Sequence, residues 1–368
     1  MTQLKMKLTS IVNVYSILPL IAFVVLFFNF GNKSPSSLSL SICAVFLALS
    51  IYISVHHAEV IAKRVGPSLG ALILALAVTV IEVGLIVSMM SNGGADSSKI
   101  ARDTVFATIM IVTNGIIGIS LFIGGLQHKE LGFQPLGTSS LLSILGVLSA
   151  LTLVLPNFTS TSLGPTYSHN QLIFISMASI FLYLVLFWSQ TVSHRNFFEP
   201  LTDEQYQTFE TQNIVPSKLE AIISLVMLIV SLVGVIGLAK TLSPFIESTL
   251  KSWGAPQETV GIVIALMVLA PETLAALNAA KTNQLQTSLN LALGSGAASI
   301  ALTIPIVSIY TILTQQSLIL GLDNKSLAFL VLTFIAGGLT FSSKKTSSIQ
   351  GLVHLVILVC YITLAFMP

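Results

Sequence analysis

Long, uninterrupted runs of apolar residues are the feature that most constrains how this chain can fold. A helix needs about 20 consecutive apolar residues to cross a hydrocarbon core roughly 30 Å thick. Only helices and closed barrels satisfy every backbone polar group in lipid, and these runs are too continuous for the alternating strands of a barrel. We predict eleven transmembrane helices near residues 9–30, 37–57, 68–92, 103–125, 138–157, 171–192, 217–241, 256–280, 286–315, 326–342 and 347–367.

The composition leads to the same class of protein. Charged residues make up 8% of the chain, against about 25% in a typical soluble domain. The net charge is only +2 and the basic residues lie in short loops, so the electrostatic footprint of a nucleic-acid-binding protein is absent. The sequence therefore predicts an all-α polytopic membrane protein whose surroundings are the lipid bilayer, with no nucleic-acid partner.

The positions of lysine and arginine predict how the helices are oriented, because cytoplasmic loops carry an excess of both. With the N-terminus in the cytoplasm, ten of the 16 basic residues fall on the cytoplasmic side and six on the other. This distribution favours a cytoplasmic N-terminus and a C-terminus outside. The longest polar loop, 194–216, is then a cytoplasmic connector.

The two halves of the chain resemble each other once the first helix is set aside. In each half the second helix carries one acidic residue deep inside, Glu82 and Glu272, and the third is rich in small and hydroxyl residues. An odd number of helices per repeat forces opposite topologies in the membrane, as in many secondary transporters. The predicted division is an N-terminal helix (1–33), a five-helix repeat (34–193), the connector (194–216) and a second, inverted five-helix repeat (217–368).

Glu82 and Glu272 carry the predicted chemistry. Glu82 lies 12 residues past Gly70, which is roughly 18 Å into its span. Neither span contains a lysine or arginine, and an acid at such depth usually marks an ion pathway or a proton relay. Each carboxyl must hold either a proton or a cation, and these are the two half-reactions of an antiporter. The alternative is a permanently protonated glutamate bonded to a neighbouring helix.

Further oxygen donors lie near these carboxyls in the sequence. Thr79, Asn114 and Ser295 are candidate cation ligands beside Glu82 and Glu272, since Ca²⁺ takes six to eight oxygens in flexible geometry and a monovalent ion accepts a similar cage. Small residues also let membrane helices pack closely, which is the alternative role for each hydroxyl.

A second polar cluster lies at the end of the predicted helix 37–57. His56 and Glu59 are three residues apart and share a helical face with each other, next to His57. Histidine titrates in the physiological range, so the cluster is predicted to be a proton access or gating group. A polar helix end at the membrane interface is the alternative.

Three segments resemble the cation/proton exchanger branch of the calcium/cation antiporter superfamily, and in particular its ChaA-type bacterial members. They are HHAEVIAKRVGPSLGALILALAVTVIEV (56–83), RDTVFATIMIVTNGIIG (102–118) and PETLAALNAAKTNQLQTSLNLALGSGAASIALTIP (271–305). The resemblance implies eleven helices with inverted five-helix repeats in a bacterial inner membrane, and cation export driven by protons. It also implies that Glu82 and Glu272 are the paired site carboxylates, and that Glu59 matches the acidic residue preceding the first motif.

The chain departs from typical calcium/proton exchangers of that superfamily in its side-chain amides. Those proteins have asparagine three residues before each site glutamate, where this chain has Thr79 and Leu269. They have glutamine after the second-repeat Gly-Ser, where this chain has Ala298. The choice among Ca²⁺, Na⁺ and K⁺ therefore stays open.

The predicted function is a secondary transporter, not an enzyme: a cation/proton antiporter that exports Ca²⁺, Na⁺ or K⁺ by alternating access and needs no cofactor. Its only predicted partners besides lipid are inorganic cations and protons. An intramembrane metal-dependent enzyme and a passive cation channel are the alternatives. The sequence contains no HExxH zinc motif, and Gly294-Ser295-Gly296 lacks the strand–turn–helix context of a nucleophile elbow.

Overall fold

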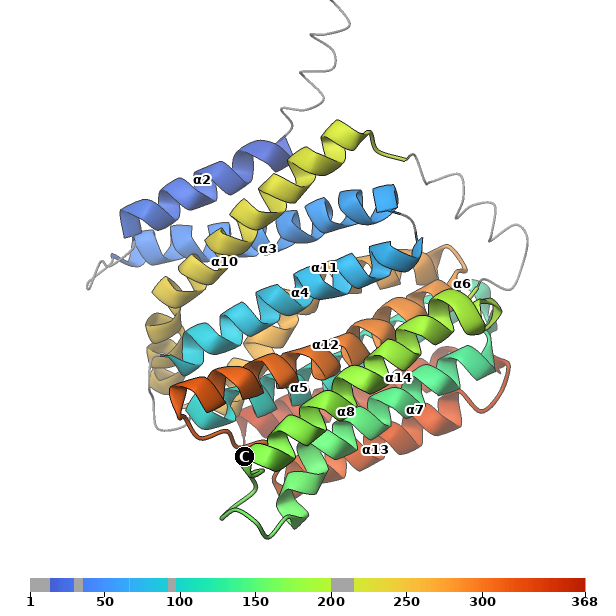
Figure 1. Ribbon diagram of the computed structural model, residues 1–368. Helices are drawn as coiled ribbons and strands as arrows, with labels where there is room; N and C mark the ends of the chain where they lie inside the picture. Colours follow the sequence, from blue (N-terminus) through green and yellow to red (C-terminus); the bar gives the residue numbers. More distant parts are fainter. Residues whose placement is uncertain (1–13, 30–35, 66, 92–96, 200–214, 368) are drawn as a thin grey trace, which may run out of the picture. The chain divides into compact units, whose positions relative to one another are not determined.

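The computed structural model describes residues 14–29, 36–65, 67–91, 97–199 and 215–367 (Figure 1). Within these ranges nine helical segments are long and apolar enough to cross a membrane, and two shorter apolar helices, Val14–Asn29 and Asn324–Thr340, complete a set of eleven. The predicted all-α fold of about eleven helices is confirmed. Residues 9–13 and 30 of the first predicted helix, and 200–214 of the predicted connector, lie outside the described residues.

The chain forms two compact units that do not coincide with the sequence halves. The first unit is made from Met1–Gly94 and Asn213–Thr249, and the second from Ala95–Gln212 and Leu250–Pro368. The predicted domain borders at 33, 193 and 216 concern sequence repeats rather than compact units, and they stay a prediction.

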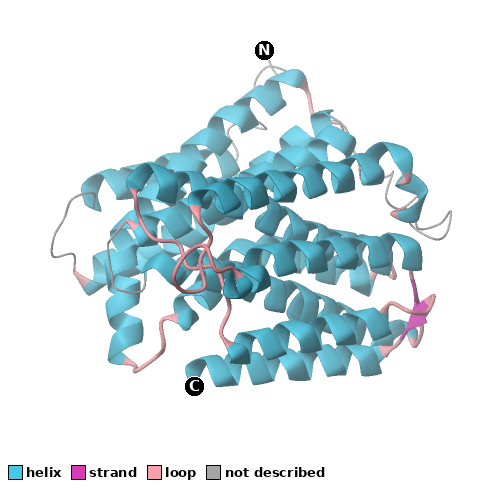
Figure 2. Cartoon of the chain, turned by 60° about the horizontal axis from the view of Figure 1, so that its bottom comes forward, coloured by secondary structure: helices cyan, strands magenta, loops and turns pink. Residues whose placement is uncertain are grey.

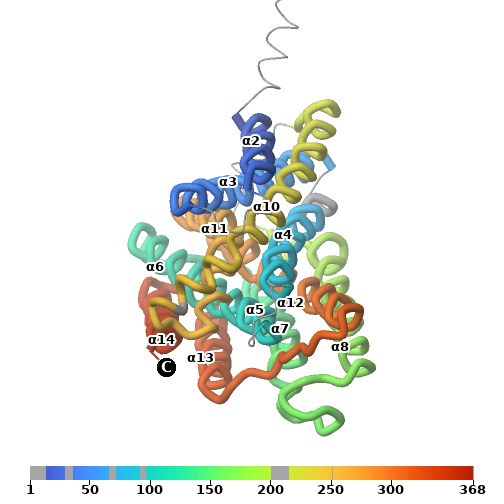
Figure 3. The backbone as a smooth tube through the Cα atoms, turned by 90° about the vertical axis from the view of Figure 1, so that its left-hand side faces the viewer, coloured from blue at the N-terminus to red at the C-terminus, as the bar shows by residue number. Residues whose placement is uncertain are grey.

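Among its described residues the first unit contains four helices, of which α3 packs against both α2 and α4 (Figures 1 and 3). They are α2 (Val14–Asn29), α3 (Ser37–Val65), α4 (Pro67–Met90) and most of α10 (Lys218–Ser252). A Cβ on Gly84 of α4 would lie 2.6 Å from the side chain of Ile236 in α10. Small residues permit this close helix approach in membranes, and the contact holds α4 at a defined distance from α10.

The second unit contains the remaining described helical elements. They are η1 (Ser97–Lys99), α5 (Ile100–Met110), η2 (Ile111–Ile116), α6 (Ile117–His128), α7 (Pro135–Ser149), η3 (Ala150–Val154), η4 (Leu155–Phe158), α8 (His169–Trp188), η5 (Ser189–Ser193), η6 (Arg195–Phe197), α11 (Glu258–Lys281), α12 (Leu285–Thr314), α13 (Asn324–Thr340) and α14 (Ser348–Phe366). Helix α11 packs against α5, and α14 packs against α6. The elements η2, η3 and η5 are π-helical segments inside longer spans, a conformation that is rare and frequent at functional sites.

Two pairs of loops fasten the ends of the second unit. Between α6 and α7, β1 (Leu131–Gly132) pairs antiparallel with β2 (Lys345–Thr346) of the α13–α14 loop (Figure 2, magenta). The α12–α13 loop is bonded to the segment before α8: the amide of Asn157 donates to the Leu322 carbonyl at 2.7 Å, and the Gly321 N–H donates to the Pro165 carbonyl at 3.0 Å. In the two predicted repeats, α6 corresponds to α12, α7 to α13 and α8 to α14. This correspondence maps the first pair of loops onto the second, as expected of two repeats.

Candidate carboxylate site

Glu82 lies in α4 of the first unit with 2% of its surface exposed. It is preceded by Thr79, also 2% exposed, and the two side chains lie three residues apart on one helical face. The Thr79 hydroxyl donates to the carbonyl of Ala75 at 2.8 Å. Its hydrogen is therefore used within the helix, which leaves oxygen lone pairs as the only group that Thr79 can offer to a cation.

Glu272 lies in α11 of the second unit with 6% of its surface exposed. It follows Pro271 inside the helix. The backbone nitrogen of proline carries no hydrogen, so it cannot bond the carbonyl of Met267 one turn earlier. Thr273, the next residue, donates its hydroxyl to the carbonyl of Leu269 at 2.7 Å. The helix around Glu272 thus combines a buried carboxylate with a backbone oxygen released by proline.

The two glutamates occupy matching places along their helices. Helix α4 runs from Pro67 to Met90, and Glu82 lies just past its midpoint. Helix α11 runs from Glu258 to Lys281, and Glu272 likewise lies just past its midpoint. Both helices have 24 residues, so each carboxyl lies well inside an apolar span. This correspondence is the one expected of equivalent positions in two repeats.

Asn114 lies in the π-helical segment η2 and is fully buried. Its amide nitrogen donates to the hydroxyl of Thr333 in α13 at 2.8 Å and to Thr113 at 3.3 Å. Its amide oxygen lies 2.9 Å from Nδ1 of His354 in α14. The structure thus places Asn114 in a buried hydrogen-bond network, and its role as a cation ligand stays a prediction.

Ser295 lies in α12, which packs against α11 in the second unit. Its side chain is half-buried. No heavy atom lies within 4 Å of the place that a Cβ on the neighbouring Gly294 would take. Ser295 belongs to the same compact unit as Glu272 and Asn114, while Thr79 and Glu82 belong to the first unit.

The predicted gating cluster lies in α3 and contacts the first helix. The rings of His56 and Tyr15 stack with their centroids 3.9 Å apart and an angle of 20° between their planes. His57 is 3% exposed, and its Nε2 lies 3.1 Å from the backbone carbonyl of Tyr15. Glu59 is half-buried one turn further along α3. The histidines thus connect α3 to α2, and their role in proton access stays a prediction.

Sequence reasoning missed two buried polar groups. His354 is 1% exposed in α14, and the signal was available as a single histidine within an otherwise apolar helix. Arg102 and Asp103 form a buried ion pair of 2.7 Å at the start of α5, and Arg102 also donates to the Gly321 carbonyl at 3.3 Å. Adjacent opposite charges at the start of a predicted span were the corresponding signal.

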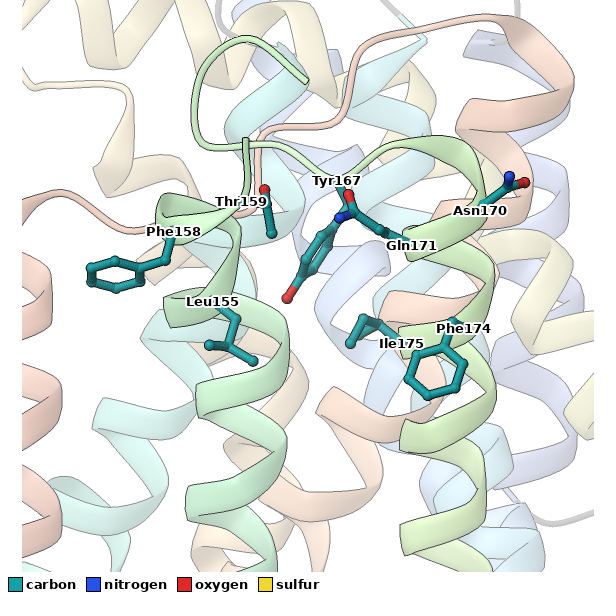
Figure 4. Close-up of a pocket in the computed structure, with 8 residues that line it drawn as sticks. All are labelled: Leu155, Phe158, Thr159, Tyr167, Asn170, Gln171, Phe174 and Ile175. Atoms are coloured by element: carbon teal, nitrogen blue, oxygen red, sulfur yellow. The ribbon is translucent and has the colours of Figure 1, made fainter. Parts of the chain in front are cut away.

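A cavity of about 400 Å³ lies in the second unit between the end of the α7 span and the start of α8 (Figure 4). Leu155, Phe174 and Ile175 give it apolar walls, and Tyr167 reaches down between the two helices to donate to the Leu151 carbonyl. No carboxylate lines it. Neither Glu82 nor Glu272 lines the cavity, so it is separate from the predicted carboxylate site. Elsewhere in the described part of the chain, no three His, Cys, Asp or Glu side chains gather where they could hold a metal ion.

Comparisons with known proteins show which family and fold the chain resembles. The family model described as sodium/calcium exchanger protein matches residues 36–192 and 223–367, one stretch in each half of the chain. A protein of Sinorhizobium fredii named as a putative ionic transporter (y4hA) is 39% identical over 96% of this chain and 95% of its own length. The sodium-potassium/proton antiporter ChaA of Escherichia coli is 31% identical over 95% of each chain. The solved structure of the H⁺/Ca²⁺ exchanger CAX matches with a TM-score of 0.70 at 15% identity, over 98% of this chain and 89% of that one.

Proposed function

The chain belongs to the sodium/calcium exchanger protein family, and from that membership we propose that it exchanges Na⁺ or K⁺ for protons at Glu82 and Glu272. The predicted resemblance and the predicted class, a multi-pass secondary transporter, are confirmed by the family match. Beyond that class, the substrate and the site residues are the content of the proposal.

The observation that carries the proposal is the matched burial of the two glutamates. Each lies inside an apolar span of 24 residues, at nearly the same place along its helix, with 6% or less of its surface exposed. A charged side chain inside a membrane is costly unless it is paired or bound to an ion. Two such residues in equivalent helices are expected when the protein uses them to carry charge across the membrane.

The exchange cycle follows from competition for the same oxygens. A carboxylate facing the cytoplasm binds a cation, alternating access exposes it to the other side, and the cation leaves. Protons then neutralise the carboxyls, which lowers the cost of returning them through the apolar interior. A proton and a cation cannot occupy one carboxyl together, and this exclusion couples the two movements without any resident cofactor.

The preference for monovalent cations has two supports. The Escherichia coli relative is named for sodium, potassium and protons. Thr79 and Leu269 stand where typical calcium/proton exchangers have asparagine, so the ligand set is poorer in amide oxygens. Ca²⁺ takes six to eight oxygens, which a reduced set supplies less readily. Ca²⁺ remains the second candidate substrate, because the family description includes calcium.

The proposed setting is the inner membrane of a bacterium, with the N-terminus in the cytoplasm and the C-terminus outside. The relatives of bacterial origin support the membrane, and the ten-to-six distribution of basic residues supports the orientation. Inorganic cations, protons and lipid are the partners that this function requires.

The test measures exchange in everted membrane vesicles acidified by respiration. Adding Na⁺, K⁺ or Ca²⁺ should discharge the pH gradient in vesicles that carry the wild-type chain. Glu82→Gln and Glu272→Gln should each abolish the discharge, because glutamine cannot bind or release a proton. Glu130→Gln is the matched control, since it makes the same chemical change at an exposed side chain that is paired with Lys345.

Two outcomes would contradict the proposal. A gradient that responds to none of the three cations would exclude this exchange, and glutamine variants that behave like wild type would exclude the site. The order in which the cations discharge the gradient in wild type decides between monovalent and divalent substrate.

A further inference from the structure

A chain of buried polar side chains connects α5, η2, α13 and α14 inside the second unit. His354 of α14 lies at its centre, with Nδ1 2.9 Å from the amide oxygen of Asn114 and Nε2 3.1 Å from the hydroxyl of Thr340. On the other side of Asn114, the Thr333 hydroxyl donates to the sulfur of Met110 at 3.4 Å. Polar groups this deeply buried are costly unless their hydrogen bonds are satisfied.

The surrounding hydroxyls determine which way the Asn114 amide points. The Thr113 hydroxyl donates to the carbonyl of Ile109, and the Thr333 hydroxyl donates to Met110. Both hydroxyl oxygens are therefore left as acceptors, and only the NH₂ group of Asn114 can bond them. The amide oxygen of Asn114 must then face α14.

This orientation in turn determines the tautomer of His354. The Asn114 oxygen carries no hydrogen, so Nδ1 of His354 must donate to it. In a neutral ring Nε2 is then an acceptor, and the Thr340 hydroxyl donates to it. Each ring nitrogen thus has a partner, so the network holds the His354 ring in one orientation.

The backbone around the network leaves little room for other arrangements. A Cβ on Gly118 of α6 would lie 3.1 Å from Cβ of His354, and one on Gly115 would lie 3.3 Å from the Leu358 side chain. The close approach of α14 lets the short His354 side chain reach into the π-helical segment. In that segment the usual helical hydrogen-bond pattern is interrupted, so a tertiary contact has more influence on its conformation.

We propose that His354 is a positioning residue of the exchanger: by donating from Nδ1 it holds the Asn114 oxygen in the orientation that supports cation binding. This inference rests on the proposed function and on Asn114 as one of its site residues. A carbonyl oxygen has two lone pairs, and His354 uses one. If the amide were flipped, it would present hydrogens in place of that oxygen, and a cation would be repelled.

The experiment compares variants that keep or remove this one donor. In His354→Asn the side-chain NH₂ can replace Nδ1–H, whereas in His354→Gln it lies near the position of Nε2. Both retain the Cβ that packs at Gly118. Thr340→Val is the matched control, because it removes a hydrogen bond from the same buried network while leaving the bond between His354 and Asn114.

The readouts are the apparent KM for the exchanged cation, the pH profile of exchange and the melting temperature of the purified chain. We expect His354→Asn and Thr340→Val to keep KM within about threefold of wild type, whereas His354→Gln raises it about tenfold or more. A merely structural role predicts instead that KM follows the melting temperature, with Thr340→Val and His354→Gln affected alike. The pH profile of His354→Asn should match that of wild type.

Three results would overturn the proposal. The first is an equal KM in the asparagine and glutamine variants, and the second is a raised KM in His354→Asn at an unchanged melting temperature. The third is a displaced pH profile in His354→Asn, which would make His354 a carrier of the transported proton. If His354→Gln does not fold, a raised KM in His354→Asn at an unchanged melting temperature still overturns the proposal. Failure of the wild type to exchange any cation would refute the proposed function instead, so the two failures are distinguishable.

Discussion

Replacing Gly261 by alanine should force α11 away from α5 and weaken the second unit. The added Cβ would lie 2.5 Å from the carbonyl carbon of Asp103 and 2.7 Å from the backbone nitrogen of Thr104, whereas ordinary contacts of a Cβ begin at about 3.4 Å. These neighbours are backbone atoms and cannot turn aside as a side chain would. The helices must therefore separate locally by about 0.9 Å, the difference between 3.4 and 2.5 Å.

The cost of that separation follows from known packing energies. Forcing extra methylenes into a packed core costs about 1–3 kcal/mol, and the higher helix propensity of alanine returns up to about 1 kcal/mol. Because the obstructing atoms are backbone, the packing cost falls at about 2–3 kcal/mol, and we expect a net loss of about 1–2 kcal/mol in the free energy of unfolding. At about 2–4 °C for each kcal/mol, the melting temperature should fall by about 2–8 °C.

The matched control is Gly338→Ala in α13. Gly338 is exposed and no heavy atom lies within 4 Å of its Cβ position, so the same change of residue meets no obstacle there. Melting curves of the two purified variants in one detergent give the comparison. A Gly261→Ala chain that melts at or above the temperature of Gly338→Ala would refute the packing argument, because the 2.5 Å contact is what distinguishes the two sites.

Two further changes test the ends of the helices. Asp323 caps α13 by accepting from the backbone amides of Lys325 and Ser326. Burial raises the pKa of the Asp323 carboxyl, but its hydrogen bonds and the nearby Lys325 charge lower the pKa by more, so the net shift is downward. Its stabilisation is thus present above the unfolded pKa and is lost as the pH falls through the lower folded pKa. Asp323→Ala should cost about 1 kcal/mol at neutral pH and make melting less sensitive to acid; an unchanged acid dependence would contradict this. Arg102→Ala should cost about 3–5 kcal/mol by leaving the Asp103 carboxylate buried, whereas Lys345→Ala, which breaks an exposed pair, should leave the melting temperature unchanged.

The spans could be predicted from the sequence because lipid demands one property over a fixed length. An apolar run identifies a helix there without any knowledge of its partners, and the predicted 171–192 corresponds to the observed His169–Ser193. The prediction was wrong where helices continue beyond the apolar run. Helix α3 extends to Val65, past the predicted end at 57, because polar residues such as Lys63 extend a helix as well as apolar ones do.

The surroundings of the site could not be read from the sequence in the same way. The short strands β1 and β2 show no alternating pattern, and they pair across a long stretch of intervening chain, from Leu131 to Thr346. The π-helical segment η2 has no distinctive residue pattern, since its shape depends on the helices that pack around it. Asn114 was identified from its polar character in an apolar span, but its bond to His354 depends on how α14 packs.

Two buried polar sites of the second unit differ in their surroundings. The amide nitrogen and oxygen of Asn114 and both ring nitrogens of His354 have hydrogen-bond partners, so the network has one stable arrangement. Glu272 lies in a helix whose own hydrogen bonds are interrupted by Pro271. In the proposed exchange the Glu272 carboxyl alternates between a proton and a cation, and Pro271 frees a backbone carbonyl one turn earlier in the same helix. This difference predicts that Glu272→Gln abolishes exchange, whereas His354→Gln leaves exchange in place with a raised KM for the cation.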